Sequence, residues 1–229
     1  MNNKILSVRT SDLLSDALRY MKIKCNIDDE SKEGARMYQG CMGIWSKYFA
    51  GSQIDILINR FGSEFIDKKQ QCLKIGTESF TCHLLKVIDA ESVTGGYLYL
   101  FHAPQVDMTS MEQTGRFYTE CWQIALVDAA RIWLERYLRR QQPEGENLSE
   151  SFGPGFYGME IEAVSAVVNQ MQAEQVGVRL LDNGMMEPAI SLVGMFLAGA
   201  KSFDMPSGDC VSCLGTSHCR MCRHYIEKD

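Results

Sequence analysis

Apolar residues recur along this chain with two periods, one typical of helices and one typical of strands. Residues at helical spacing predict helices over residues 10–21, 28–48, 77–88 and 108–140, the first capped by Thr10 or Ser11. Short runs rich in β-branched and aromatic residues, with turn residues around them, predict strands at 54–60 and 97–102.

The longest helical pattern carries two different faces. An apolar stripe is formed by Trp122, Leu126, Ala130, Trp133 and Tyr137. A second face carries residues that can form charge pairs four positions apart: Asp128, Arg131, Glu135 and Arg139. This pattern predicts a long scaffold helix.

A polar linker, residues 141–150, ends that helix, and the pattern then changes. A glycine-rich turn at 151–158 precedes a helix with Ile161, Val164, Val168 and Met171 along one side, and strands are predicted at 176–181 and 189–197. The mixed order of elements predicts an α+β fold. We therefore expect one domain over residues 1–205, with a mostly antiparallel sheet flanked by long helices, followed by a four-cysteine tail at 206–229.

Composition and charge narrow the function. Hydrophobic residues make up 45% of the 229 residues and charged residues 23%, as in ordinary globular proteins. The formal net charge of -6 argues against a nucleic-acid partner, which requires clustered Lys and Arg. No apolar stretch approaches the roughly 20 residues that span a bilayer, and residues 1–9 lack the apolar centre of a signal peptide. We expect a cytoplasmic protein with no membrane partner.

The glycine-rich turn is the first candidate site. Gly153 and Gly155 permit close approach of the backbone to a ligand, and Pro154 stiffens the turn. Unpaired N–H groups at the start of the following helix, near Met159, are suited to a carboxylate. The alternative interpretation is an ordinary helix-entry loop.

Two segments together resemble a known family. The turn Gly153-Pro154-Gly155-Phe156, the helix after it and the segment from Met185 to Gly194 resemble the activation domain of cobalamin-dependent methionine synthase. That family has an Arg-x-x-Pro-Gly-Tyr turn, a helix and a Met-x-Pro-x-x-Ser-x-x-Gly segment at similar spacing. The resemblance extends from about residue 115 to 200.

The resemblance implies a ligand and a partner. In that family the turn contributes to binding S-adenosylmethionine and presents its methyl group to cobalamin, which another domain carries. The residues implied to bind S-adenosylmethionine here are Gly153, Pro154, Gly155, Phe156, Tyr157, Met186, Pro188 and Ser191. No catalytic acid or base is implied, because the protein orients the reactants. The implied role is an accessory protein that assists reductive activation of a cobalamin-dependent methyltransferase, with cobalamin present only through a corrinoid partner.

The chain also departs from the family at three positions. Ser151 stands where the family has arginine, and it cannot form a charge-assisted pair with the ligand carboxylate. Phe156 and Phe196 stand where the family has tyrosines, although Tyr157 adjoins the first.

The second candidate site is a cysteine cluster near the C-terminus. Two C-x-x-C pairs separated by five residues let four thiolates converge on zinc or an iron-sulfur cluster: Cys210, Cys213, Cys219 and Cys222. The alternative is a set of redox-active disulfides. The other five cysteines are interpreted as core or surface thiols. This cluster keeps two further functions open, a metal-stabilised binding module without enzymatic activity and an iron-sulfur electron carrier for a corrinoid protein.

The cysteine cluster is expected to bind iron-sulfur or zinc at roughly one equivalent per chain. Metal analysis and visible absorption after anaerobic purification check this. The variant Cys213→Ser should loosen the tail and leave the core folded, because the cluster lies beyond the last predicted strand. Protein that contains neither metal, without exposure to oxygen or chelator, would contradict the prediction.

Overall fold

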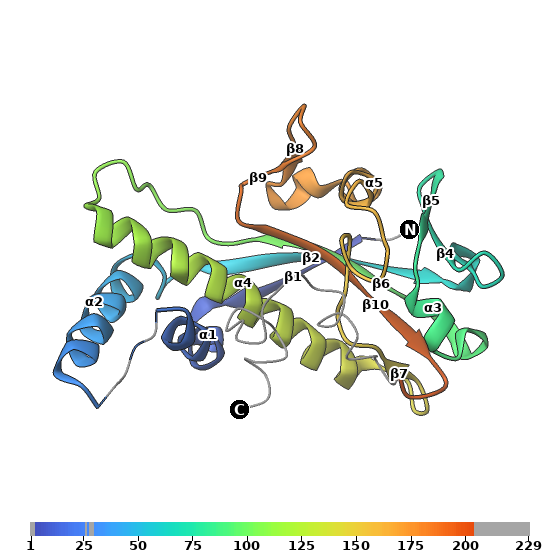
Figure 1. Ribbon diagram of the computed structural model, residues 1–229, viewed down its shortest axis with the longest axis horizontal. Coiled ribbons are helices and arrows are strands. Elements are labelled where there is room, and N and C mark those ends of the chain that lie inside the picture. The colour runs from blue at the N-terminus through green and yellow to red at the C-terminus, as the bar shows by residue number, and fades with distance from the viewer. Residues whose placement is uncertain (1–2, 26, 28–29, 204–229) are drawn as a thin grey trace.

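A five-stranded antiparallel sheet forms the centre of the computed structural model, which describes residues 3–25, 27 and 30–203 (Figure 1). The strands lie in the order β1 (Asn3–Arg9), β2 (Gln53–Gly62), β6 (Val93–His102), β10 (Ser191–Gly199) and β7 (Asn147–Leu148). Helices cover the sheet, and the predicted α+β class is confirmed. The predicted cysteine tail lies outside the described residues.

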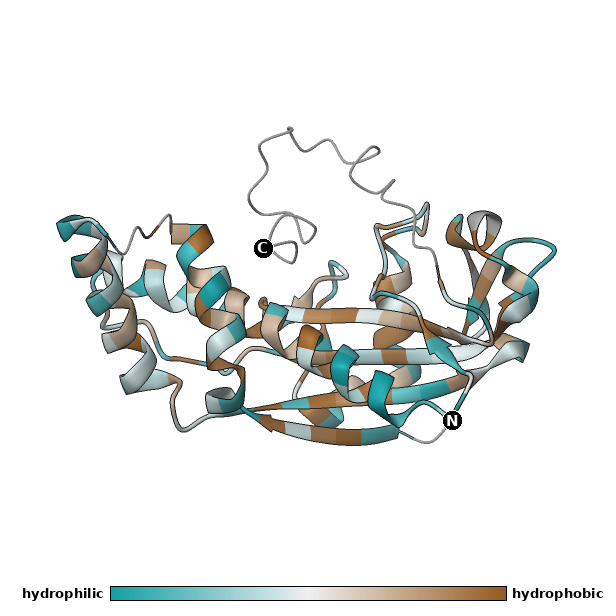
Figure 2. Ribbon diagram, turned by 90° about the horizontal axis from the view of Figure 1, so that it is seen from below, coloured by the Kyte–Doolittle hydropathy of each residue, from teal (hydrophilic) through white to brown (hydrophobic). Residues whose placement is uncertain are grey.

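The central strands bury side chains on both faces of the sheet. Tyr97, Tyr99 and Phe101 of β6 belong to one hydrophobic cluster, whereas Leu98 and Leu100 belong to the other. Successive side chains of a strand point to opposite faces, so β6 supplies both clusters in turn. Figure 2 shows bands of hydrophobic residues along these strands.

Three helices cover the first face: α1 (Thr10–Cys25), α2 (Lys32–Tyr48) and α4 (Gln113–Gln141). Trp122 of α4 packs on Trp45 of α2 with ring centroids 4.9 Å apart, and its indole N–H donates to the Cys41 carbonyl at 2.9 Å. The long-helix prediction is confirmed. Its buried stripe continues through Leu134 and Leu138, which leaves Trp133 and Tyr137 partly buried.

Smaller elements cover the second face. A three-stranded sheet consists of β3 (Ile66–Asp67), β4 (Cys72–Ile75) and β5 (Glu78–Thr81), and α3 (Leu84–Val87) follows it. Helix α5 (Ala163–Met171) and the hairpin of β8 (Arg179–Leu180) and β9 (Met186–Glu187) complete this side. Because α5 and the three-stranded sheet share one hydrophobic cluster with the central strands, they pack as a single layer.

Several local predictions were wrong. Residues 77–88 form β5 and the short α3 instead of one helix. The side chains of Leu73, Ile75 and Phe80 recur at every second position of a β-hairpin and are buried on one side of it. The edge strands β1 and β7 were not predicted. Within the described ranges, no helix is both long and apolar enough to cross a bilayer.

Tyr99 joins three neighbouring strands. It lies opposite Gly194 of β10. Its hydroxyl forms a 2.5 Å hydrogen bond with the buried hydroxyl of Ser151, in the segment that lies on the other side of β10 from β6. A Cβ atom on Gly194 would lie 2.3 Å from the Tyr99 hydroxyl and 2.9 Å from the Phe152 carbonyl. Gly194 is therefore required so that the Tyr99 side chain can pass over β10 and reach Ser151.

Replacing Gly194 by alanine is expected to reduce the free energy of unfolding by about 1–3 kcal/mol through overpacking. The control Gly43→Ala adds a methyl group with nothing within 4 Å, in the interior of α2, and should be neutral or stabilising. Urea denaturation of both variants measures the difference. Equal unfolding midpoints for the two variants would show that a methyl group at position 194 does not obstruct the Tyr99 side chain.

Candidate functional site

The predicted turn at residues 153–157 is fixed to β10. The Phe152 N–H donates to the Met195 carbonyl at 3.0 Å, and the Met195 N–H donates back at 2.7 Å. A Cβ atom on Gly153 would lie 3.1 Å from the Val193 carbonyl, and Pro154 is buried. The start of the turn therefore continues the central sheet, and the glycine allows its backbone to lie close against β10.

The rest of the turn bends outward. Gly155 and Tyr157 adopt positive φ, at +89° and +50°, and Phe156 between them is 52% exposed. The Tyr157 carbonyl accepts a hydrogen bond from the His83 N–H at 2.7 Å. The ring of Phe156 is therefore exposed to solvent. The backbone before and after it is held by the hydrogen bonds of Phe152 and Tyr157.

His83 lies at this site, although it was not selected from the sequence. Its imidazole lies so close to Gly158 that a Cβ atom there would be 2.5 Å from Nδ1. The neighbouring Cys82 is fully buried, and burial raises the pKa of its thiol to about 11. The Cys82 side chain has no exposed surface, so its thiol is not accessible to a substrate at this site.

The second predicted segment forms the β8–β9 hairpin and the start of β10. The Leu181 N–H donates to the Met185 carbonyl at 2.8 Å and closes the hairpin. The Ser191 hydroxyl donates to the Pro188 carbonyl at 2.6 Å, and Ser191 lies opposite His102 of β6. Ser191 therefore fixes the bend between the hairpin and β10.

Both segments contact the beginning of α5. A Cβ atom on Gly155 would be 3.8 Å from Ile161 Cδ1, and one on Gly184 would be 4.0 Å from Ser165 Oγ. These segments and the α5 entry carry four exposed large hydrophobic side chains: Phe156, Ile161, Leu181 and Met185. We call the surface formed by residues 153–161 and 181–191 the α5 surface. The structure brings the predicted turn and hairpin to the same end of one helix.

The first amides of α5 itself are already paired. The N–H groups of Ala163, Val164 and Ser165 donate to the carbonyls of residues 160–162, at 3.0–3.2 Å. The helix begins at Ala163 rather than near Met159, and a tight turn already satisfies its first amides. The predicted helix start near Met159 was therefore early, whereas the expectation that a carboxylate binds at the amides of this turn stays a prediction.

Two of the departures from the family pattern lie in the interior. Ser151 is 7% exposed and bonded to Tyr99, and Phe196 is fully buried against the Tyr99 ring at a centroid distance of 5.3 Å. An arginine at position 151 would have to displace Tyr99. Replacing Ser151 by arginine therefore does not restore a carboxylate anchor at the α5 surface.

The five single cysteines are free thiols, and Cys25, Cys41 and Cys82 are buried. Cys25, Cys41 and Cys121 come from three helices and lie together. The Cys121 hydrogen bond lowers the pKa of Cys25, but the Cys41 hydrogen bond and burial outweigh it and raise that pKa to about 11. Among the described residues, no group of three or more His, Cys, Asp or Glu side chains is arranged to hold a metal ion.

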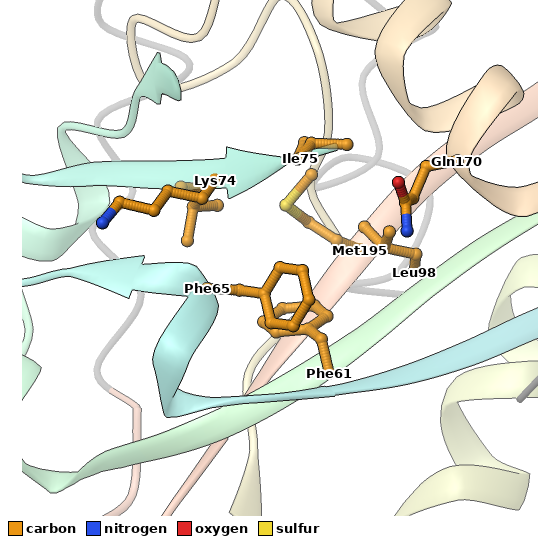
Figure 3. Close-up of a pocket in the computed structure, with 8 residues that line it drawn as sticks. Phe61, Phe65, Lys74, Ile75, Leu98, Gln170 and Met195 are labelled. Carbon is orange, nitrogen blue, oxygen red and sulfur yellow. The ribbon is translucent and has the colours of Figure 1, made fainter. Parts of the chain in front are cut away.

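A small cavity lies between the central and the three-stranded sheets. Phe61, Phe65, Leu98 and Met195 line it, and Gln170 reaches its rim (Figure 3). Its volume of about 10 Å³ is at the lower limit for one water molecule. This cavity is too small for S-adenosylmethionine.

Comparison with solved structures shows a fold that is already known. No protein-family model matches the chain, and no curated protein matches its sequence. A crystal structure of the MetH reactivation domain bound to AdoHcy has a similar fold, with a TM-score of 0.61 and 10% identity. The similarity covers 90% of this chain and 79% of that chain. At this identity it establishes a fold like that of the reactivation domain and nothing about the ligand of this chain.

Proposed function

We propose that this chain is an accessory protein that binds S-adenosylmethionine or S-adenosylhomocysteine at the α5 surface and assists reductive reactivation of a corrinoid-dependent methyltransferase. The observation that carries the proposal is the fold shared with a reactivation domain crystallised with AdoHcy, over 90% of this chain. The convergence of the predicted turn and hairpin on α5 supports the same site.

The chain's own residues would supply apolar contact and a fixed backbone. Phe156 and Ile161, which are 52% and 61% exposed, offer flat and branched apolar surface to an adenine or a thioether. The turn that carries Phe156 is anchored to β10 through Phe152, so little ordering is needed on binding. Without a paired arginine the ligand carboxylate would remain in water, and binding is expected to be weak.

The corrinoid would be held by another polypeptide. The corrinoid would supply a reduced cobalt that accepts the methyl group of S-adenosylmethionine, with S-adenosylhomocysteine as the leaving group. The contribution of this chain would be to hold the sulfonium in line with the cobalt, which is an entropic effect. This role requires no acid or base, consistent with the protonated Cys82 thiol beside the turn.

A second candidate is a binding module that has kept the fold and lost the nucleoside ligand. The buried Ser151 favours it, because its short side chain cannot hold a ligand carboxylate. This module would still dock on a corrinoid protein. The two candidates differ in a single measurable property, the binding of S-adenosylhomocysteine.

Calorimetry with S-adenosylhomocysteine tests the ligand. Replacing Phe156 by alanine should weaken binding by about three- to tenfold, because an aromatic contact contributes roughly 0.5–1.5 kcal/mol. The control Phe117→Ala removes a similarly exposed ring, 49% against 52%, from α4. It should leave the affinity unchanged. Equal effects of the two variants would exclude the α5 surface, and no heat of binding to the unmodified chain would favour the second candidate.

Titration against corrinoid proteins tests the partner. The chain should bind one cobalt state more tightly than the others, because only a difference in affinity can shift the partner toward the arrangement for reactivation. Each candidate partner is prepared oxidised, reduced and methylated, and binding is measured by pull-down or calorimetry. The interface should be modest, since the corrinoid face must be released again. Equal or undetectable binding in all states would refute the reactivation role.

A further inference from the structure

We infer that a cavity between α1 and α4 is a binding site for a small oxyanion, a phosphate or a carboxylate, with Arg19 as its principal donor. The cavity has a volume of about 210 Å³, and its polar lining consists of Asp16, Arg19, Tyr20, Glu135, Arg136 and Arg139. It lies on the face of the central sheet opposite α5, because α1 and α4 pack in the other hydrophobic cluster. The inference is therefore independent of the proposed function.

Both carboxylates in the cavity already have arginine partners. Arg136 forms a two-pronged pair with Asp16, with Nη1 2.6 Å from Oδ2 and Nη2 3.3 Å from Oδ1. Arg139 binds Glu135 Oε1 through Nε at 3.1 Å and Nη2 at 2.9 Å. These pairs neutralise two of the three arginines.

Arg139 is also engaged on its remaining nitrogen. Its Nη1 donates to the Leu148 carbonyl at 2.7 Å and ties the end of α4 to the edge strand. Arg139 is therefore a structural residue of the cavity wall. It has little capacity to turn toward an incoming ligand.

Arg19 is left as the uncompensated charge. Its Nη2 is shielded from solvent and has no hydrogen-bond partner in the part of the chain that the structure describes. Three guanidinium groups against two carboxylates give the cavity a net charge of +1. Arg19 is half-buried, and leaving its shielded Nη2 donor without a partner is unfavourable, so an anion that accepts from this nitrogen would remove that cost.

The geometry limits the kind of anion. A guanidinium group presents a planar fork of donors that matches the oxygens of a carboxylate or a phosphate. A volume of about 210 Å³ is many times the roughly 10–15 Å³ that one water requires, which leaves room for one such group and its hydration. Arg136 at the mouth is 60% exposed, so a small anion can enter from solvent.

Thermal unfolding of the full chain with inorganic phosphate, acetate or chloride at equal ionic strength tests the site. Phosphate or acetate should raise the melting temperature by about 2–4 °C more than chloride. A larger effect of phosphate would assign a phosphate ligand, and a larger effect of acetate a carboxylate ligand.

Arg19→Gln should weaken binding roughly tenfold or more. Arg9→Gln removes the same charge from an exposed pair and should retain the full response.

Two further measurements keep the test decisive if Arg19→Gln folds poorly. Arg19→Met removes the guanidinium group and keeps the apolar stem, so it should fold and lose the anion response. In the unmodified chain, the Arg19 Nε–H signal in a nitrogen–proton correlation spectrum should shift on titration with phosphate or acetate. A response that persists in Arg19→Met, or no response beyond that of chloride in the unmodified chain, would overturn the inference.

Discussion

Burial of β6 on both faces is the constraint on which the rest of this structure depends. Tyr97, Tyr99 and Phe101 are covered by the long helices, and Leu98 and Leu100 by α5 and the small sheet. Each such side chain contributes roughly 1.5–3 kcal/mol when it is fully removed from water. A strand that is apolar on both sides must be covered on both sides, so neither helical layer can be lost without exposing half of the strand.

The sequence predicted the elements whose signal is local and missed those that depend on pairing. The apolar stripe of α4 and the β-rich runs of β2 and β6 were sufficient for correct assignment. Residues 77–88 were misassigned because a short hairpin and a helical turn contain too few positions to separate their two periods. Strand β1 is defined by its register with β2, a contact between distant parts of the chain.

The candidate site was predicted in its segments but not in its surroundings. The turn and the hairpin were found from their resemblance to a known family. The contact of His83 with Gly158, and the burial of Ser151, depend on residues far apart in sequence. A single sequence does not show that Tyr99 reaches Ser151 across Gly194, so position 151 was interpreted as a ligand position when its side chain belongs to the interior.

The crossing of Tyr99 over Gly194 also determines how the α5 surface can move. The hydrogen bond between Tyr99 and Ser151 connects the segment that leads into the turn to β6. The backbone hydrogen bonds between Phe152 and Met195 connect the same segment to β10. Opening this segment would require breaking hydrogen bonds of the sheet, so the segment should open less readily than a surface loop. The start of the turn is therefore a fixed platform, and under the proposed function any closure over a ligand would come from the β8–β9 hairpin or from a partner.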